Sequence, residues 1–554
     1  MVLYPDQSHL QRLRTIYQPS LPPILTDLSS LQAFPVENQE VPLEDEIHKL
    51  FPLTVAQPNL IFKRVSSERS DPLKIGVVFS GGQAPGGHNV IAGLLDAMLK
   101  LNRDSRLIGF LDGPNGLTKN NYTELTSEMI APYRNQGGFD LIGSGRSKIE
   151  TAEQFEALGK NVRALKLDGL VIIGGDDSNT NAAFLAEYFK RKGLDISIIG
   201  VPKTIDGDLK NRFIETSFGY DTACKIYSEI IGNLAKDALS ARKYYFFVKL
   251  MGRSASHVTL ECAVKTQINL ALIGEEVSAL KLTLPRLIDQ IADMICLRAA
   301  RGKNHGVILI PEGIIEFIEE FKYMIQELNR LLSHSGNESE ADRISKIDLI
   351  IQALTTNSAT CFSSLPEEFQ KQLLIDRDPH GNIQVSKIET ERLFICLVEK
   401  ELVKRKNQGN YIGAFNPQPL FCGYEGRSGL PSNFDCHYCY SLGHVAALLI
   451  NSRVSGYMAC IQNLGKPVSK WEINGISLTK MLHLEDRKGI LAAVIRKGPV
   501  DLEGTLFNYY KEKRSAWLLE DHYCCPGPIQ YEGDLELVDA PPLSLTLPSN
   551  FSAN

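Results

Sequence analysis

The chain has 554 residues, of which 43% are hydrophobic and 22% charged, so it is long enough to form two or more globular domains. The net charge of −6 gives no electrostatic reason to expect a nucleic acid or an anionic membrane as a partner, and no apolar run reaches the roughly 20 residues that a membrane span needs. Because the first residues lack the pattern of a signal peptide, we expect the eleven cysteines to be reduced and the protein to be cytoplasmic.

Residues 1–72 are rich in proline and lack a strong hydrophobic period, which predicts an irregular arm around the body of the protein. From residue 73 the pattern changes to apolar strands that alternate with helices of ten or more residues. This alternation predicts an α/β fold with parallel sheets that helices cover on both faces. The expected strands are 73–79, 106–113, 167–175, 195–202, 244–252, 270–274 and 305–313, and the expected helices are 88–102, 179–193, 222–242, 255–267 and 283–301.

Residues 315–419 interrupt this alternation. The stretches 314–336 and 389–409 are helical in pattern and no clear strand lies between them, so a mostly helical insertion is predicted. After it we expect a helix near 433–452 and a strand at 457–464. The last thirty or so residues are again rich in proline and are predicted to form an extended tail.

Cys436 and Cys439 have the spacing of metal ligands, with His437 between them. A zinc site would need a second pair at suitable spacing, and the surrounding run is helical in pattern. We therefore expect ordinary helix residues here.

A glycine-rich loop, "SGGQAPGGHN", follows the strand that ends near residue 79 and precedes a helix. Glycine lets the backbone approach a phosphate closely, and the start of a helix presents free N–H groups to an anion. The loop matches neither the Walker pattern nor GxGxxG, so a simple tight turn is the alternative.

The stretch "IIGGDDSNT" repeats this arrangement with two carboxylates, Asp176 and Asp177, after the strand. Mg²⁺ is usually held by one or two carboxylates together with substrate oxygens, and the carboxyl ends of strands are where α/β folds bind ligands. Alternatively the two aspartates have no further role, in a helix start that Ser178 or Asn179 caps.

In "VPKTIDGDLK", three charged residues, Lys203, Asp206 and Asp208, follow a strand that ends at a proline. Asp206 would suit a general base that accepts a hydroxyl proton, and Lys203 a charge that stabilises a transferring phosphoryl group. A charged loop without chemistry is the alternative. Arg253 and Arg427, which also follow strand-like stretches, can each bind a sugar phosphate through two parallel hydrogen bonds.

Taken in order, "SGGQAPGGHN", "GGDDS", "PKTIDGD", "MGR", "PEG" and "YEGR" make the chain resemble the phosphofructokinase family over about 73–312 and 420–465. The variants "GGDDS" and "PKTIDGD", with the long arm and the helical insertion, are similar to its long pyrophosphate-dependent branch. The resemblance implies two Rossmann-like domains with the active site in the cleft between them. It also implies this organisation: 1–72, arm; 73–220 with about 420–480, pyrophosphate- and Mg²⁺-binding α/β domain; 221–314, fructose 6-phosphate-binding α/β domain; 315–419, helical insertion; 481–554, C-terminal extension.

The resemblance further implies a role for each matching residue. Gly82 lies against pyrophosphate, Arg146 contacts the phosphoryl donor and Asp176 holds Mg²⁺, the one cofactor implied. Asp206 is the base that takes the proton from the sugar 1-hydroxyl as that oxygen attacks phosphorus.

Fructose 6-phosphate binding is implied for a larger set of residues. Two of them, Lys243 and Tyr244, match a position supplied across a subunit interface, so we expect a homodimer. The rest of the set is Thr204, Ile205, Asp206, Met251, Gly252, Arg253, Glu312, Tyr424, Glu425, Gly426 and Arg427.

The double aspartate suggests which donor is used. ATP-using members of the family have glycine where Asp177 and Lys203 stand. Two unit charges about 4 Å apart at an effective dielectric constant of about 20 repel by about 4 kcal/mol, roughly three decades in affinity. Asp177 would therefore exclude the α-phosphate of ATP, and Lys203 would compensate charge on a shorter donor. The expected activity is a reversible, Mg²⁺-dependent phosphoryl transfer from pyrophosphate to fructose 6-phosphate.

Three alternatives remain. One is an ATP-dependent kinase of the same fold, against which Asp177 and Lys203 argue. Another is a non-catalytic regulatory subunit, which should have lost the base or the metal ligand, whereas "TIDGD" and "GGDDS" are intact. The last, a nicotinamide- or lipid-kinase-like protein with a GGD motif, would not need "PKTIDGD" or "YEGR".

Overall fold

The computed structural model describes residues 8–36, 42–66, 70–333, 347–375, 383, 387–487, 490–529 and 541–548. The chain divides into two compact units. Unit 1 is Met1–Ile226, Tyr424–Gly498 and Ile529–Thr546; unit 2 is Tyr227–Gly423, Pro499–Pro528 and Leu547–Asn554. Among the described helices, none has both the length and the apolar character required to cross a membrane.

Unit 1 is built on a nine-stranded sheet of order β1-β2-β13-β12-β7-β6-β3-β4-β5. Its middle strands, β12, β7, β6, β3 and β4, are parallel, and antiparallel strands extend it at both edges. A separate hairpin joins β14 to β15. The strands are β1 (Leu31–Pro35), β2 (Leu60–Arg64), β3 (Lys74–Ser80), β4 (Arg106–Phe110), β5 (Tyr122–Leu125), β6 (Gly169–Gly174), β7 (Ser197–Pro202), β12 (Tyr457–Gln462), β13 (Glu472–Ser477), β14 (Leu482–Arg487) and β15 (Ile490–Ile495).

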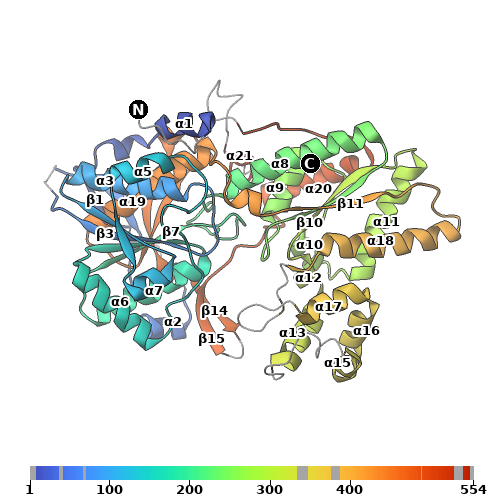
Figure 1. The fold of residues 1–554 in the computed structure, drawn as a ribbon, viewed down its shortest axis with the longest axis horizontal. Coiled ribbons are helices and arrows are strands. Elements are labelled where there is room, and N and C mark those ends of the chain that lie inside the picture. Colours follow the sequence, from blue (N-terminus) through green and yellow to red (C-terminus); the bar gives the residue numbers. More distant parts are fainter. Residues whose placement is uncertain are drawn as a thin grey trace. The chain divides into compact units, whose positions relative to one another are not determined.

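Helices cover both faces of this sheet, α3 and α19 on one side and α6 and α7 on the other (Figure 1). Strands β3, β6 and β7 are buried along nearly their whole length, which is why they read as continuous apolar runs. The helices that begin in unit 1 are α1 (His9–Ile16), α2 (Asp45–Leu50), α3 (Gly87–Leu101), α4 (Pro114–Lys119), α5 (Ser127–Ile130), α6 (Ala152–Leu165), α7 (Asp176–Arg191), α8 (Tyr220–Ala241), α19 (Asn433–Asn451) and α21 (Leu543–Thr546), with 3₁₀ turns η1 (Pro23–Thr26), η2 (Ala131–Tyr133), η4 (Tyr424–Arg427), η5 (Val468–Lys470) and η6 (Leu478–Met481).

Unit 2 has a four-stranded parallel sheet of order β11-β8-β10-β9. Strand β11 contains Pro417 and Pro419 and lies at the edge, where a residue without an N–H group is tolerated. The strands are β8 (Tyr245–Leu250), β9 (Leu270–Ala271), β10 (Gly306–Pro311) and β11 (Pro417–Cys422); the helices are α9 (His257–Thr266), α10 (Gly274–Ala279), α11 (Leu284–Ala300), α12 (Ile314–Phe317), α13 (Glu319–Ser333), α15 (Ile347–Ala353), α16 (Thr356–Ser364), α17 (Glu367–Ile375), α18 (Thr390–Asn407) and α20 (Thr505–Leu519).

The region between β10 and β11 is helical in its described part, from α12 to α18. Its helices share one hydrophobic core with the sheet of unit 2, since Phe247 of β8 and Ile308 of β10 belong to the same buried cluster as Phe369 of α17 and Phe394 of α18. The inserted helices are therefore packed onto the sheet.

The α/β fold class predicted from the alternation of strands and helices is confirmed. The prediction of an irregular arm was wrong: residues 31–35 and 60–64 form β1 and β2, which pair with each other and, through β13, complete the sheet of unit 1. These strands were not predicted because residues 1–72 are rich in proline and show no strong hydrophobic period. The extended tail falls partly outside the described residues, and β14, β15 and α20 were not predicted from the sequence.

Helices α3 and α19 pack through glycines. A methyl group added at Gly93 of α3 would overlap the carbonyl oxygen of Tyr440, and one at Gly443 of α19 would overlap that of Val90. The two backbones therefore approach more closely than alanine would allow. This contact matters for function because α3 begins at the glycine-rich loop and α19 follows the "YEGR" segment.

We expect Gly93→Ala to destabilise the protein by about 1–3 kcal/mol, because the helices must move apart. Gly159→Ala in α6 is the matched control: its methyl group would have its nearest neighbour 3.8 Å away, an ordinary contact. The control should be neutral or stabilising, since alanine favours a helix. Thermal melting monitored by circular dichroism measures both, and equal melting temperatures for the two variants would contradict the packing argument.

Candidate functional site

The loop after β3 lies close to several basic side chains of unit 1. Gly81 has φ +92°, a conformation that favours glycine, and its carbonyl oxygen accepts a hydrogen bond of 2.6 Å from the Ser144 hydroxyl. A Cβ atom placed on Gly82 would lie 3.6 Å from the guanidinium groups of both Arg146 and Arg427. Two segments about 280 residues apart therefore bring positive charge to one glycine.

Lys203 is buried beneath this loop. Its backbone N–H donates to the Gly174 carbonyl at 3.0 Å, and its ammonium group would lie 3.1 Å from a Cβ atom on Gly81. Burial lowers the pKa of Lys203 to about 8, against the opposing effect of the Asp206 carboxylate; nearby Arg427 lowers it further. The site thus contains a buried cation held among other charges.

The negative charge around Lys203 comes from the carboxylates of Asp206 and Asp176. The carboxylate of Asp208 lies close to both of these. Asp206 lies in a turn in which its N–H donates to the Thr204 hydroxyl at 3.1 Å. Asp208 is almost fully buried, and burial together with the negative charge of Asp206 raises its pKa to about 7.

One further cation, Lys497, was not identified from the sequence. Its ammonium group lies 3.5 Å from Asp176 and 3.8 Å from Asp208. It follows β15, in the C-terminal extension for which no role was predicted. No local pattern in the sequence indicates that this residue returns to Asp176, some 320 positions earlier.

Helix α7 begins at Asp176, with Gly175 as its first flanking residue. The predicted caps were wrong, because the Ser178 hydroxyl instead donates to Ser80 at 2.8 Å and the Asn179 amide donates to the Gly174 carbonyl at 2.6 Å. The carboxylates of Asp176 and Asp177 in the first turn stabilise the positive end of the helix dipole of α7 without a side-chain cap.

Asp177, also in the first turn of α7, forms an ion pair of 3.2 Å with Lys148. Asp177 is 47% exposed and Lys148 34% exposed. Both partial neutralisation and solvent screening therefore reduce the repulsion that Asp177 can exert on an anionic ligand.

The "YEGR" segment forms the turn η4. The Arg427 guanidinium lies 5.0 Å from the centre of the Tyr424 ring, which is 70% exposed. Glu425 is exposed and Gly426 buried. In the loop after β7, Thr204 is half-buried and Ile205 is buried.

In unit 2 the predicted sugar-phosphate residues divide between the two ends of β8. At its carboxyl end, the N–H of Met251 donates to the carbonyl of Cys422, and the N–H of Glu312 donates to that of Leu250. Met251, Gly252 and Glu312 are buried and Arg253 is exposed.

Lys243 and Tyr244 precede β8 and so lie at its amino end, with the Lys243 ammonium 4.9 Å from the Tyr244 ring centre. Six strand residues separate them from Met251, a distance of roughly 20 Å. Within unit 2, the structure therefore does not bring Lys243 together with Met251 and Glu312.

Cys436 and Cys439 lie on α19, as predicted, and both are buried. His437 accepts a hydrogen bond of 2.8 Å from the Ser20 backbone N–H. This contact ties the N-terminal arm to α19.

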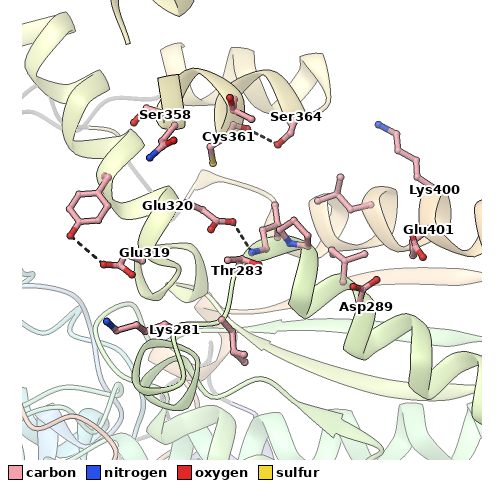
Figure 2. Close-up of a pocket in the computed structure, with 18 of the residues that line it drawn as sticks. Lys281, Thr283, Asp289, Glu319, Glu320, Ser358, Cys361, Ser364, Lys400 and Glu401 are labelled. Atoms are coloured by element: carbon pink, nitrogen blue, oxygen red, sulfur yellow. Dashed lines mark hydrogen bonds between the residues drawn. The ribbon is translucent and has the colours of Figure 1, made fainter. Parts of the chain in front are cut away.

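A hollow of about 990 Å³ lies in unit 2 among α11, α13, α16 and α18 (Figure 2). It contains none of the predicted site residues. Its carboxylates are engaged with their neighbours: Glu320 accepts from the Leu284 N–H at 2.9 Å, and Glu327 accepts from the Thr355 N–H and hydroxyl. The better candidate for the functional site is therefore the charged cluster of unit 1, which consists of Lys203, Arg146, Arg427, Asp176, Asp206 and Asp208.

The residues at this cluster fit Mg²⁺. In the part of the chain that the structure describes, no group of three or more His, Cys, Asp or Glu side chains could hold a metal ion by itself. Mg²⁺ does not need such a group, because it takes one or two carboxylates and completes its coordination with water and phosphate oxygens. Asp176, which is 20% exposed and is one of the charges around Lys203, suits that role.

These features define an α/β protein with a cluster of basic and acidic side chains at the carboxyl ends of its parallel strands. The chain belongs to the phosphofructokinase family, whose model, described as "Phosphofructokinase", matches residues 74–355.

Two curated relatives and one solved structure extend this result. The chain is 49% identical to the pyrophosphate--fructose 6-phosphate 1-phosphotransferase of Treponema pallidum, with 91% of this chain and 90% of the relative covered. It is 52% identical to the subunit beta of that name from Ricinus communis, with 88% of each covered. A pyrophosphate-dependent phosphofructokinase structure from Nitrosospira multiformis matches the fold with a TM-score of 0.53 at 14% identity, covering 86% of this chain and 96% of that one.

The pKa of Lys203 predicts how anion binding depends on pH. Asp206, Asp176, Arg427 and Arg146 surround this lysine, and burial, the largest cause, lowers its pKa to about 8. As the pH rises from 7 to 9.5, Lys203 loses its charge. We expect sulfate, whose own charge is constant in this range, to bind about tenfold more weakly, a loss of about 1.4 kcal/mol.

Calorimetric titration at several pH values measures this dependence. Lys203→Arg is the control, because a guanidinium stays charged throughout, so that only the weaker pH dependence caused by ionisation of Asp208 should remain. A wild-type affinity that does not change across pH 8 would contradict the assignment.

Proposed function

We propose that this protein catalyses reversible phosphoryl transfer from pyrophosphate to the 1-hydroxyl of fructose 6-phosphate, with Mg²⁺ as cofactor. The observation that carries the proposal is the buried Lys203 beneath the Gly81–Gly82 loop, with Arg146 and Arg427 beside it. Three cations around one loop suit a compact, highly charged donor. The names of the relatives given above support the same activity.

In this reaction the 1-hydroxyl oxygen of the sugar attacks the terminal phosphorus of pyrophosphate. The bond from that phosphorus to the bridging oxygen breaks, and phosphate leaves. Asp206 accepts the hydroxyl proton, while Lys203, Arg146 and Arg427 stabilise charge on the phosphoryl oxygens. The products are fructose 1,6-bisphosphate and phosphate.

Asp176 is the residue we assign to Mg²⁺. When bound, this ion neutralises part of the charge on the phosphoryl oxygens and orients them. We assign Gly82 to the donor, and Thr204, Ile205, Met251, Gly252, Arg253, Glu312 and Tyr424 to Arg427 to fructose 6-phosphate, on the motifs that these residues match.

The two other activities considered for this fold receive less support. An ATP-dependent kinase would need space and neutral surroundings where Asp177 and Lys203 stand. A non-catalytic regulatory subunit would not need Asp206 and Asp176, which here lie within one charged cluster with Lys203.

The first test is a coupled assay of the pure protein with fructose 6-phosphate, Mg²⁺ and either pyrophosphate or ATP. We expect turnover with pyrophosphate and little with ATP. The variant Asp206→Asn tests the role of the base in the same assay. It keeps the shape of the side chain but removes the base, so turnover should fall by at least about 10²-fold. Turnover with ATP alone, or an Asp206→Asn variant as active as the wild type, would refute the proposal.

The role of Asp177 predicts how donor preference changes. Since Asp177 is half exposed and paired with Lys148, its repulsion of a donor charge is nearer to the value in water, about 1 kcal/mol at 4 Å. Asp177→Gly should therefore raise the ratio of kcat/KM for ATP to that for pyrophosphate by about fivefold. In the double variant Asp177→Gly with Lys203→Gly, this ratio should rise further. The two effects should not be additive, because both side chains border one site.

Asp177→Asn separates charge from volume. If asparagine raises the ratio as much as glycine does, repulsion dominates; if only glycine raises it, steric exclusion dominates. Unchanged donor ratios in both variants and in the double variant would show that Asp177 does not select the donor.

We further propose a cytoplasmic homodimer in which Lys243 and Tyr244 serve the sugar site of the partner subunit. Their place at the amino end of β8, roughly 20 Å from Met251, suits a role outside their own unit. The structure describes all eleven cysteines and none is in a disulfide bond, which supports a reducing compartment.

Light scattering combined with activity at increasing dilution tests the dimer. Activity should fall as the dimer dissociates, because each site then lacks a positive charge. A fully active monomer would contradict the assignment of Lys243.

A further inference from the structure

The β14–β15 hairpin brings one cation to the carboxylates of the candidate metal site. Lys497, two residues after β15, lies with its ammonium group 3.5 Å from Asp176 Oδ2 and 3.8 Å from Asp208 Oδ2. It is partly buried, with 35% of its side chain exposed, whereas Asp208 has 6% exposed. One ammonium group thus lies within ion-pair distance of two carboxylates, one at the start of α7 and one in the loop after β7.

The backbone on both sides of Lys497 is fixed to these same loops. The N–H of Ile495 donates to the Thr180 hydroxyl of α7 at 2.9 Å, and the N–H of Gly498 donates to the Asp208 carbonyl at 2.7 Å. A methyl group added at Gly498 would overlap the carbonyl oxygen of Lys210. The position of Lys497 is therefore set by the start of α7 and by the "TIDGD" loop.

We propose that Lys497 is a positioning residue of the metal site: it holds the Asp176 and Asp208 carboxylates in place while the metal is absent and competes with the divalent cation for Asp176. This inference rests on the proposed function only in assigning Asp176 to the metal. Without Lys497, the repulsion between the two carboxylates would be opposed at Asp176 only by the more deeply buried Lys203.

This arrangement has a consequence for the order of binding. A divalent cation arriving alone must displace the ammonium group from Asp176, whereas one arriving with a phosphate-containing donor brings compensating negative charge. Lys497 should therefore weaken metal binding to the free protein and favour entry of the metal together with the donor.

Binding of Mn²⁺ to the substrate-free protein, followed by electron paramagnetic resonance, tests the inference directly. Lys497→Met removes the charge and keeps the length of the side chain, so we expect Mn²⁺ to bind about tenfold more tightly. Lys497→Arg keeps the charge and should remain within about twofold of the wild type. Arg496→Met is the matched control, since it removes the same charge from an exposed neighbour and should change little.

Adding Asp176→Asn to Lys497→Met should abolish the gain, which locates the metal at Asp176. Unchanged or weaker Mn²⁺ binding in Lys497→Met, or a gain that persists without Asp176, would overturn the inference. Circular dichroism verifies folding, and Lys497→Gln replaces the methionine variant if that one does not fold. Because no substrate is present, this result is independent of the donor assay, which tests the proposed function separately.

Discussion

The burial of one lysine charge is the constraint on which the proposed site depends. Lys203 is enclosed beneath a glycine loop and remains partly charged because carboxylates surround it, while Arg427 and Arg146 add positive charge nearby. Burying a cation in that position costs desolvation free energy, which lowers the stability of the folded protein. An anion bound in the proposed site would offset this cost, which accounts for a lysine of strongly lowered pKa at the carboxyl edge of the parallel strands.

Packing contacts elsewhere in unit 1 hold the segments that carry this charge cluster in place. The Gly93 and Gly443 contacts hold α3, which starts at the loop, against α19, which follows Arg427. The N-terminal arm contributes as well, because the buried Arg14 donates hydrogen bonds to the carbonyl oxygens of Asn135 and Pro431. The N-terminal arm, for which the sequence predicted no role, thus contacts the segment next to Arg427.

The buried parallel strands and the residues directly after them could be predicted from the sequence, because apolar runs and glycine loops are local signals. Lys203 and Asp206 were identified in this way. The strands of the arm and the position of Lys497 could not be predicted, since both depend on pairing between segments hundreds of residues apart. The Lys148 partner of Asp177 was also missed, since no local pattern in the sequence pairs these two residues, and their ion pair weakens the electrostatic argument drawn from the sequence alone.

The measurement closest to the central claim is calorimetric titration of pyrophosphate, without Mg²⁺, into wild-type protein and two variants. The account predicts that Lys203→Met binds at least about tenfold more weakly than the wild type, since a buried charge facing the anion is lost. Lys148→Met, which removes an ammonium group that is paired and partly exposed, should change the affinity by less than about threefold. Equal affinities for the wild type and Lys203→Met would contradict the account.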